Sequence, residues 1–283
     1  MQRLISYYVL IAVMAVVGGV EAAQTGASFK PDRMVVYKSV AGGDLELHLF
    51  LPQGWKPSDR RAGIVFFFGG GWVGGSPEQF YPHSRRLASL GMVAMSAVYR
   101  TMKSNGTDPF ACIADGKSAV RWIRTHAGEL GIDPERIVAS GGSAGGHVAA
   151  STALLPHLRN SDEDSSVSSV PNALILFNPV IDTTMRGYGA EKLGTRALDA
   201  SPAHHVVAGV PPTLIFHGTA DTTVPFENVT RFCTLMQEHG NECELVPYEG
   251  KTHGFFNYDR DRAVFEDTMR RAETFLRKLG YLP

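Results

Sequence analysis

This chain of 283 residues has few cysteines, almost no excess of positive or negative charge, and few long apolar runs. Three cysteines are too few for a disulfide-rich scaffold, and no C-x-x-C or His/Cys spacing indicates a metal site. The 27 basic and 28 acidic residues leave a formal net charge of −1, which excludes a strongly basic face for nucleic acid. We therefore expect no metal, no nucleic-acid partner, and a neutral or weakly charged small molecule as ligand.

Nucleotide-binding motifs are absent as well. The glycine-rich segment at 141–146 lacks the Gly-Lys-Ser/Thr ending of a P-loop, and no G-x-G-x-x-G is followed by an acidic residue about 20 positions later. No cofactor is therefore expected. With 44% hydrophobic residues, the chain can build a stable core for one or at most two domains.

The N-terminal apolar run, Leu4 to Val17, covers about 14 residues, whereas a membrane span needs roughly 20. Arg3 precedes the run, and Val20 and Ala22 are small residues at plausible cleavage positions. This pattern predicts a signal peptide over residues 1–22, a mature domain over 23–283, and export to the periplasm or medium without a stable membrane span. An uncleaved membrane anchor is the alternative.

The three cysteines separate into one pair and one single residue. Cys233 and Cys243 are ten positions apart and bracket the expected end of a helix and start of a strand. They form either a disulfide or two buried thiols. Cys112 is expected to be a packed thiol.

Short apolar runs recur along most of the chain, and they lack the polar alternation of half-exposed strands. They lie at 64–68, 92–98, 137–138, 173–177, 213–216 and 243–246, after an expected hairpin of 34–40 and 45–51. Helices are expected between them: Ser76 to Gln79 combines an N-cap, a first-position Pro and a capping-box Gln, and Asp108-Pro109 opens another. The alternation predicts a three-layer α/β fold with a mostly parallel central sheet and helices on both faces.

The segment Gly141-Gly-Ser-Ala-Gly145 follows one of these strands and precedes an apolar helical stretch. A serine in a G-x-S-x-G turn between strand and helix is held at the edge of the sheet with its hydroxyl accessible. The glycines remove side chains that would clash in so sharp a turn. This pattern indicates the nucleophile of an α/β-hydrolase at Ser143.

A serine nucleophile requires a base and an acid that orients it, in the chain order Ser, acid, His for this fold. Asp221 lies in the turn after the expected strand at 213–216, and His253 lies in the loop after the last strand. We predict the catalytic triad Ser143, Asp221 and His253. Asp182 is the alternative acid, and His217 is expected to be structural.

Catalysis by acyl transfer also requires donors for the oxyanion. Three consecutive glycines follow the strand at 64–68, and we predict that the backbone N–H groups of Gly70, Gly71 and Ala144 form the oxyanion hole. A plain glycine turn between strand and helix is the alternative for residues 69–71.

With these residues in place, the chain resembles the α/β-hydrolase serine esterases of the hormone-sensitive-lipase type, and more narrowly exported bacterial carbohydrate esterases such as acetylxylan and feruloyl esterases. The resemblance covers most of residues 34–283 and rests on six motifs. These are Gly69-Gly-Gly-Trp72, Ser96-Ala-Val-Tyr-Arg100, Ile132-Asp-Pro-Glu-Arg136, Gly141-Gly-Ser-Ala-Gly-Gly146, His217-Gly-Thr-Ala-Asp221 and Gly250-Lys-Thr-His-Gly254. One departure is clear: Phe68 stands where the family has the histidine of His-Gly-Gly-Gly, so the glycine loop needs another brace.

Substrate contacts are predicted from position alone. Trp72 lies beside the oxyanion glycines, Tyr81 is nearby in sequence, and Asn178 follows a strand at its carboxyl end. The irregular stretch at 182–209, which includes Tyr188, is interpreted as a small cap or a pocket wall, and a wandering connection is the alternative. The family's large lid sequences are not evident, which by resemblance implies short acyl groups.

The sequence thus predicts an exported serine esterase that acts on short-chain or carbohydrate-linked esters, foremost acetyl esters of a polysaccharide or oligosaccharide. A feruloyl esterase and a general short-chain lipolytic enzyme are alternatives within the same chemistry. A serine peptidase of the prolyl-oligopeptidase type and a catalytically silent binding module are alternatives from other classes.

Overall fold

The computed structural model of the chain describes residues 29–158, 164 and 166–283. The predicted signal peptide at 1–22 lies outside the described residues. None of the helices that the structure describes is both long and apolar enough to span a membrane.

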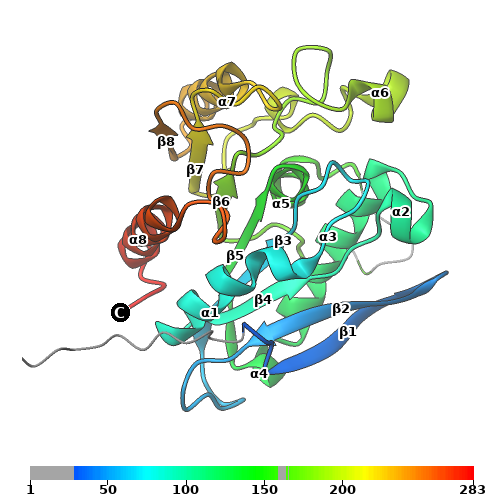
Figure 1. The fold of residues 1–283 in the computed structure, drawn as a ribbon. Coiled ribbons are helices and arrows are strands. Elements are labelled where there is room, and N and C mark those ends of the chain that lie inside the picture. Colours follow the sequence, from blue (N-terminus) through cyan, green and yellow to red (C-terminus); the bar gives the residue numbers. More distant parts are fainter. Residues whose placement is uncertain (1–28, 159–163, 165) are drawn as a thin grey trace, which may run out of the picture.

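One sheet organises the described chain, and its eight strands run in the order β1-β2-β4-β3-β5-β6-β7-β8 (Figure 1). Strands β1 and β2 form the expected antiparallel hairpin and β2 is antiparallel to β4, whereas every pair from β4 to β8 is parallel. The strands are β1 (Arg33–Val40), β2 (Gly43–Phe50), β3 (Arg61–Phe67), β4 (Val93–Ala97), β5 (Ile132–Gly142), β6 (Ala173–Phe177), β7 (Thr213–Gly218) and β8 (Cys243–Tyr248).

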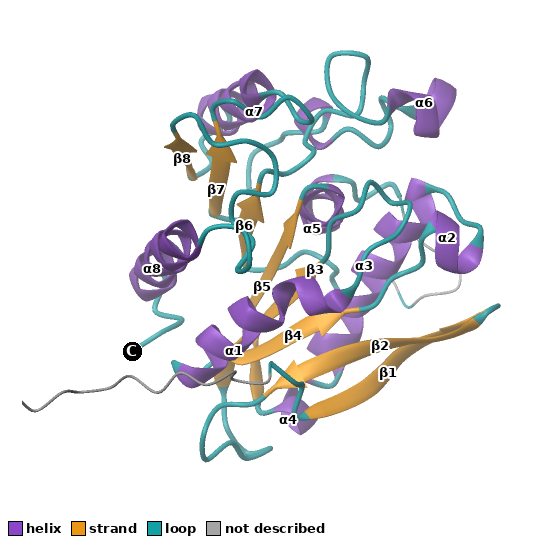
Figure 2. Ribbon diagram, viewed as in Figure 1, coloured by secondary structure: helices purple, strands orange, loops and turns teal. Residues whose placement is uncertain are grey.

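Helices cover both faces of this sheet (Figure 2). They are α1 (Tyr81–Ser89), α2 (Met102–Asn105), α3 (Pro109–Thr125), α4 (Ala127–Leu130), α5 (Ala144–Leu154), α6 (Ala190–Leu193), α7 (Phe226–Glu238) and α8 (Arg262–Lys278), with short 3-10 turns η1 (Pro77–Phe80), η2 (Gly194–Arg196) and η3 (Pro202–His204). Helices α1 and α8 pack on one face, and α3, α5 and α7 pack on the other. The predicted three-layer α/β-hydrolase fold is confirmed.

Strand β3 shows why the unalternating apolar runs form a buried sheet. Val65 and Phe67 belong to the core on the side of α3 and α5, whereas Ile64 and Phe66 belong to the core on the side of α1 and α8. Successive side chains of a strand point to opposite faces, so a strand covered on both faces is apolar along most of its length.

The expected helix starts are present, with one change. Asp108 accepts a hydrogen bond from the backbone N–H of Ala111 at 3.1 Å and caps α3, and Ser76 Oγ accepts from Glu78 N–H at 3.3 Å at the start of η1. The predicted capping-box role of Gln79 is wrong, because its carboxamide contacts Gly69 and Asn257 instead.

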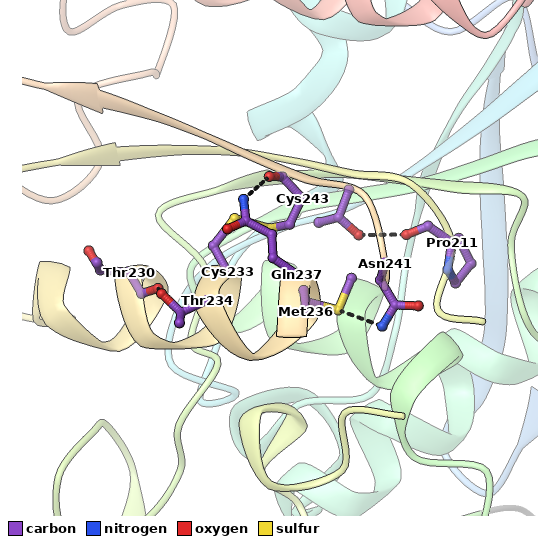
Figure 3. The surroundings of a disulfide bond; sticks show 9 residues. Pro211, Thr230, Cys233, Thr234, Met236, Gln237, Asn241 and Cys243 are labelled. Carbon is purple, nitrogen blue, oxygen red and sulfur yellow. Dashed lines mark hydrogen bonds between the residues drawn. A yellow bond between two sulfur atoms is a disulfide. The ribbon is translucent and has the colours of Figure 1, made fainter. Parts of the chain in front are cut away.

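Cys233 of α7 and Cys243 of β8 form a disulfide, with their Cα atoms 5.5 Å apart (Figure 3). Gln237 Nε2 donates a hydrogen bond to the carbonyl of Cys243 at 3.1 Å beside it. The disulfide links α7 covalently to β8, the edge strand of the sheet. Cys112 is a buried free thiol of α3, and burial raises its pKa well above the ordinary value.

His83 of α1 is a buried polar residue on the opposite face. Its ring lies among phenylalanines, with centroids 4.8 Å from Phe265, 4.9 Å from Phe80 and 5.4 Å from Phe177. Within the described residues neither ring nitrogen has a hydrogen-bond partner. Burial lowers the pKa of His83 to about 3, so the ring is neutral at ordinary pH.

Candidate active site

Ser143 occupies a sharp turn between the end of β5 and the start of α5. Its backbone angles are φ 54° and ψ −120°, which a residue with a side chain rarely adopts. Its N–H donates to the carbonyl of Phe177 at 3.0 Å, and its carbonyl accepts from the N–H groups of His147 at 3.0 Å and Val180 at 3.2 Å. These three bonds hold the strained turn in place through its backbone and do not involve the hydroxyl.

The glycines around Ser143 are required by close backbone approach. A Cβ at Gly145 would lie 2.0 Å from the carbonyl oxygen of Phe67, and one at Gly141 would lie 2.4 Å from the carbonyl oxygen of Gly145. Both distances are far below van der Waals contact. Strand β3 and helix α5 can therefore approach each other only if these positions carry no side chain.

Asp221 and His253 come from the loops that follow β7 and β8, and parallel strands bring both loops to the same edge of the sheet as Ser143. His253 Nε2 lies 2.9 Å from Ser143 Oγ, and His253 Nδ1 lies 2.7 Å from Asp221 Oδ2. The three side chains form one hydrogen-bonded row. The imidazole can accept the hydroxyl proton at Nε2 when Nδ1–H donates to the carboxylate.

The carboxylate of Asp221 is kept ionised by its surroundings. Burial by itself raises the pKa of Asp221, but hydrogen bonds from His217, His253 and the N–H of Val224 outweigh burial and lower the pKa well below the ordinary value. The N–H groups of Thr223 and Val224 donate to Oδ1 at 2.9 Å each. A fixed anion at this point can stabilise a positive charge on His253.

His217 is the buried neighbour of this carboxylate. Its Nε2 lies 2.9 Å from the carbonyl oxygen of Val224 and 3.3 Å from Asp221 Oδ2. Two acceptors around Nε2 require a proton there, so the ring helps to hold Asp221 in position. The structure thus gives His217 a structural place beside Asp221.

Asp182, the alternative acid, lies elsewhere. It is buried, forms an ion pair with Arg231 of α7, and accepts hydrogen bonds from the N–H of Thr184 at 2.8 Å and its hydroxyl at 2.6 Å. With these partners Asp182 fixes the start of the 182–209 stretch and has no hydrogen bond to His253.

The predicted oxyanion donors lie at two loop ends beside Ser143. Gly70 and Gly71 have φ values of 130° and 62°, and a Cβ at Gly70 would lie 2.0 Å from the carbonyl oxygen of Gly74. Ala144 is the first residue of α5, where backbone N–H groups have no partner within the helix. Within the described residues, no acceptor takes a hydrogen bond from the N–H groups of Gly70, Gly71 and Ala144.

Phe68, which replaces the family histidine, is held by an aromatic stack. Its ring lies 4.1 Å from that of Tyr99 at an interplanar angle of 17°, and the Tyr99 hydroxyl donates to the Phe68 carbonyl at 2.5 Å. On the other side of the loop, the N–H of Gly69 donates to Gln79 Oε1 at 2.6 Å. A stacked ring and a glutamine therefore fix the glycine loop without a histidine.

Ser143 and His253 line a cleft of about 760 Å³. Residues 69–71, Asn178, Tyr188 and Phe256 contribute to its walls, and polar and charged residues surround the rest: Ser76, Glu78, Gln79, Thr223, Asn257, Asp259 and Arg260. The cleft is therefore apolar near Phe256 and carries several polar and charged side chains elsewhere in its lining.

Two of the predicted substrate contacts, Tyr81 and Trp72, do not belong to the cleft lining. Tyr81 lies in α1 outside the cleft lining, where its hydroxyl is 2.5 Å from His48 Nδ1 and its ring packs against Phe50. Trp72 is 1% exposed and lies behind the wall, with its ring 5.1 Å from that of His147 and 5.6 Å from that of Tyr188. Both predictions relied on a short sequence distance to the glycines. That distance does not determine where a side chain points, because its direction is set by the local backbone.

Asn178 does line the cleft, although it is fully buried. Its Oδ1 accepts a hydrogen bond from the N–H of Gly254 at 2.9 Å, next to His253. Its own N–H donates to the carbonyl of Phe216 at 2.7 Å. This arrangement makes Asn178 a support for the histidine loop at the floor of the cleft.

The sequence did not predict Gln79 and Asn257 as residues of the cleft lining, and it predicted Tyr188 only as part of the 182–209 stretch. Tyr188, from the 182–209 stretch, lines the cleft next to Gly71, and its hydroxyl accepts a hydrogen bond from Lys192 Nζ at 3.0 Å. A side chain with the role of Gln79 could have been expected, because Phe68 leaves the glycine loop without the family's histidine. No sequence signal marked Asn257.

The fold and the row Ser143, His253 and Asp221 define an α/β-hydrolase with a serine at the nucleophile position. A family profile described as BD-FAE matches residues 47–184, and the profile of the dienelactone hydrolase family matches residues 174–280. Together they span the sheet from β2 to β8.

Among solved structures, esterase 2 of Thermogutta terrifontis phosphoramylated by tabun is 52% identical, with a TM-score of 0.85 over 88% of this chain and 95% of that chain. Its propionate-bound form is 49% identical, with a TM-score of 0.86 over 90% of this chain and 97% of that chain. The chain belongs to the α/β-hydrolase serine esterases, a family of carboxylic ester hydrolases.

A probable isoprenylcysteine alpha-carbonyl methylesterase of Arabidopsis thaliana is 29% identical over 245 residues, which are 77% of this chain and 51% of that protein. The chain spans about half the length of the first curated relatives that it matches.

Proposed function

We propose that this chain hydrolyses short-chain carboxylic esters through an acyl-enzyme on Ser143. The observation that carries the proposal is the hydrogen-bonded row in which His253 Nε2 lies 2.9 Å from Ser143 Oγ and His253 Nδ1 lies 2.7 Å from Asp221 Oδ2. A hydroxyl is a weak nucleophile at neutral pH, and a neutral imidazole at this distance is the base that activates it.

In the proposed reaction, Ser143 Oγ bonds to the ester carbonyl carbon while its proton passes to His253 Nε2. The negative charge that develops on the carbonyl oxygen is stabilised by the free N–H groups of Gly70, Gly71 and Ala144. The intermediate collapses as the C–O bond to the alcohol breaks, and the alcohol oxygen takes the proton from His253. Water then attacks the acyl-enzyme by the same route and releases the carboxylic acid.

Short acyl groups are proposed on the strength of relatives and of the cleft. Structures of Thermogutta terrifontis Est2 with propionate and with butyrate bound share 49% and 48% identity with this chain. The polar lining around Glu78, Asn257 and Arg260 suits an alcohol with several hydroxyl groups. We therefore propose acetyl esters of a saccharide as the substrate class.

The catalytic proposal is tested with Ser143→Ala. Hydrolysis of p-nitrophenyl acetate should fall by about 10⁴-fold or more, and labelling by a fluorophosphonate probe should disappear. Full retention of activity in the variant would contradict the proposal. Failure of the unaltered protein to react with the probe would favour a silent binding module.

The substrate proposal is tested separately by comparing products from natural polymers. Acetate release from acetylated xylan should exceed ferulate release from feruloylated arabinoxylan, and p-nitrophenyl acetate or propionate should be cleaved faster than the octanoate. A preference for ferulate would replace the acetyl proposal with a feruloyl esterase. Equal rates on all simple esters without polymer activity would indicate a general lipolytic enzyme.

Export is proposed from the N-terminal sequence, whose residues 1–22 lie outside the described part of the chain. Expression of the full chain in a bacterial host, followed by mass measurement of the purified protein, tests it. A measured mass that matches a chain beginning at residue 23 supports cleavage. A mass that includes Met1, found in the membrane fraction, supports the uncleaved anchor.

A further inference from the structure

Gln79 reaches both loops on which the proposed catalysis depends. It belongs to η1, which precedes α1, and its carboxamide extends into the cleft. Oε1 accepts from the N–H of Gly69 at 2.6 Å, and Nε2 donates to Asn257 Oδ1 at 2.9 Å. A carboxamide has one acceptor end and one donor end, and here each end serves a different loop.

Asn257 continues the connection toward the histidine. Its Nδ2 donates to the carbonyl of Gly254 at 2.9 Å, and the N–H of Gly254 donates to Asn178 Oδ1 at 2.9 Å. Gly254 follows His253 directly, so both backbone polar groups of the residue next to the histidine are held. Arg260 adds a bond of 2.8 Å from its guanidinium to the carbonyl of His253.

The glycine loop is held in a complementary way. Tyr99 fixes the carbonyl of Phe68 at 2.5 Å, and Gln79 fixes the next N–H, that of Gly69. The peptide between Phe68 and Gly69 therefore cannot rotate without breaking one of these bonds. Fixing this peptide anchors the start of the glycine loop, which carries the N–H groups of Gly70 and Gly71.

We infer that Gln79 and Asn257 form a clasp that sets the distance and angle between the oxyanion loop and the His253 loop, and that the clasp replaces the brace lost with Phe68. The inference rests on the proposed function, because it assigns the clasp to the same reaction. Both are positioning residues: they act through Gly69 and Gly254, and they have no bond to Ser143. A clasp of this kind stabilises the transition state, in which the oxyanion contacts are made, more than the bound ester.

Gln79→Met tests the clasp, since methionine has a similar length and no amide. We expect kcat for p-nitrophenyl acetate to fall by about 10- to 100-fold with KM changed by less than about threefold, because small displacements of catalytic groups cost this much. Gln237→Met is the matched control: it removes one glutamine bond, to the Cys243 carbonyl, away from the cleft. Its kcat should equal that of the unaltered protein.

Asn257→Leu breaks the clasp at its other residue. It keeps the proposal testable if Gln79→Met fails to fold. Its kcat should fall by a similar factor, and the double variant should be no worse than the more impaired single variant, because the two side chains act as one unit. Independent, multiplying losses would overturn the clasp, as would an unchanged or higher kcat in Gln79→Met. The last result would mean that the carboxamide obstructs the cleft.

Hydrogen exchange of the Gly69 amide separates failure of the clasp from failure of the proposed function. The amide should be protected in the unaltered protein and in Gln237→Met, and should exchange at least about tenfold faster in Gln79→Met. If the unaltered protein cleaves no ester, the esterase proposal fails while this measurement still judges the contact. Unchanged exchange in Gln79→Met would overturn the clasp even in an active enzyme.

Discussion

The turn around Ser143 and the wall behind the cleft at Trp72 are both closely packed, but by different kinds of contact. At the turn, Gly141 and Gly145 are pressed against backbone carbonyls, so no side chain fits. At the wall, Trp72, Tyr188 and the ammonium of Lys192 stack side chain on side chain, with Lys192 Nζ 4.4 Å from the Tyr188 ring centroid and 5.8 Å from that of Trp72. Backbone crowding tolerates no substitution, whereas side-chain packing tolerates those that preserve volume.

The strongest way to test this contrast uses two buried aspartates. Asp221→Asn should lower kcat by about 10³- to 10⁴-fold, because an amide cannot hold His253 in the tautomer that activates the serine. Asp182→Asn, beside the wall, should leave kcat within about threefold and lower the free energy of unfolding by about 1–3 kcal/mol, because Arg231 loses its partner. Ester hydrolysis and urea unfolding measure the two effects. Equal losses of kcat would contradict the assignment of Asp221 as the triad acid.

Backbone crowding is tested with two glycine substitutions. Gly145→Ala should lower the free energy of unfolding by about 3 kcal/mol, since its Cβ would lie 2.0 Å from the Phe67 carbonyl and 2.3 Å from that of Phe68. Gly128→Ala in α4 is the control, because a Cβ there meets nothing within 4 Å. Its stability should be unchanged or slightly higher. Thermal unfolding of both variants tests the pair, and equal melting temperatures would contradict it.

A pH titration sharpens the difference between the polar site and the apolar core. His83 has a folded pKa of about 3, below its unfolded value, so the unfolded chain binds more protons between these two values. Stability therefore falls as pH falls, and His83 should account for about 2 kcal/mol of loss between pH 7 and pH 5. His83→Leu should remove that part of the slope in urea unfolding. An unchanged slope would show that the ring is not buried in its neutral form.

The smallest expected effects come from two tyrosines. Tyr188→Phe removes a hydroxyl that lines the cleft, so KM or kcat for acetyl esters should change by about two- to fivefold. Tyr81→Phe removes the contact with His48 and should lower stability by about 1 kcal/mol with no change in KM. Steady-state kinetics on both variants measures the contrast. If Tyr81→Phe changed the kinetics as much as Tyr188→Phe, the prediction from the sequence that Tyr81 contacts the substrate would be supported.

The elements of the sheet were predictable because their signals are local. Residues 64–68 and 173–177 are apolar at every position, which is typical of a strand covered on both faces. The Asp108 cap needed only a partner three residues away. Gln79 was misassigned because its partners are distant: Gly69 is 10 positions away and Asn257 is 178 positions away.

The pocket residues were harder for the same reason. Tyr81 and Trp72 are near the glycine loop in sequence, but the phase of α1 turns Tyr81 toward His48, and the positive φ of Trp72 sends its ring behind the wall. The catalytic assignment of Ser143, Asp221 and His253 remains a prediction about chemistry, although the structure brings the three side chains into hydrogen-bond contact.

The sequence by itself determined the fold class and the Ser143 turn, because unbroken apolar runs and steric exclusion at glycines act over a few residues. The chain order of acid and histidine followed from the motif order of that fold. Only the tertiary structure decided which carboxylate meets His253, which side chains line the cleft, and that Gln79 and Asn257 hold the two loops together. Those outcomes depend on rotamers and on loops from separate strand ends, and such contacts form only when parallel strands bring distant segments to one edge of the sheet.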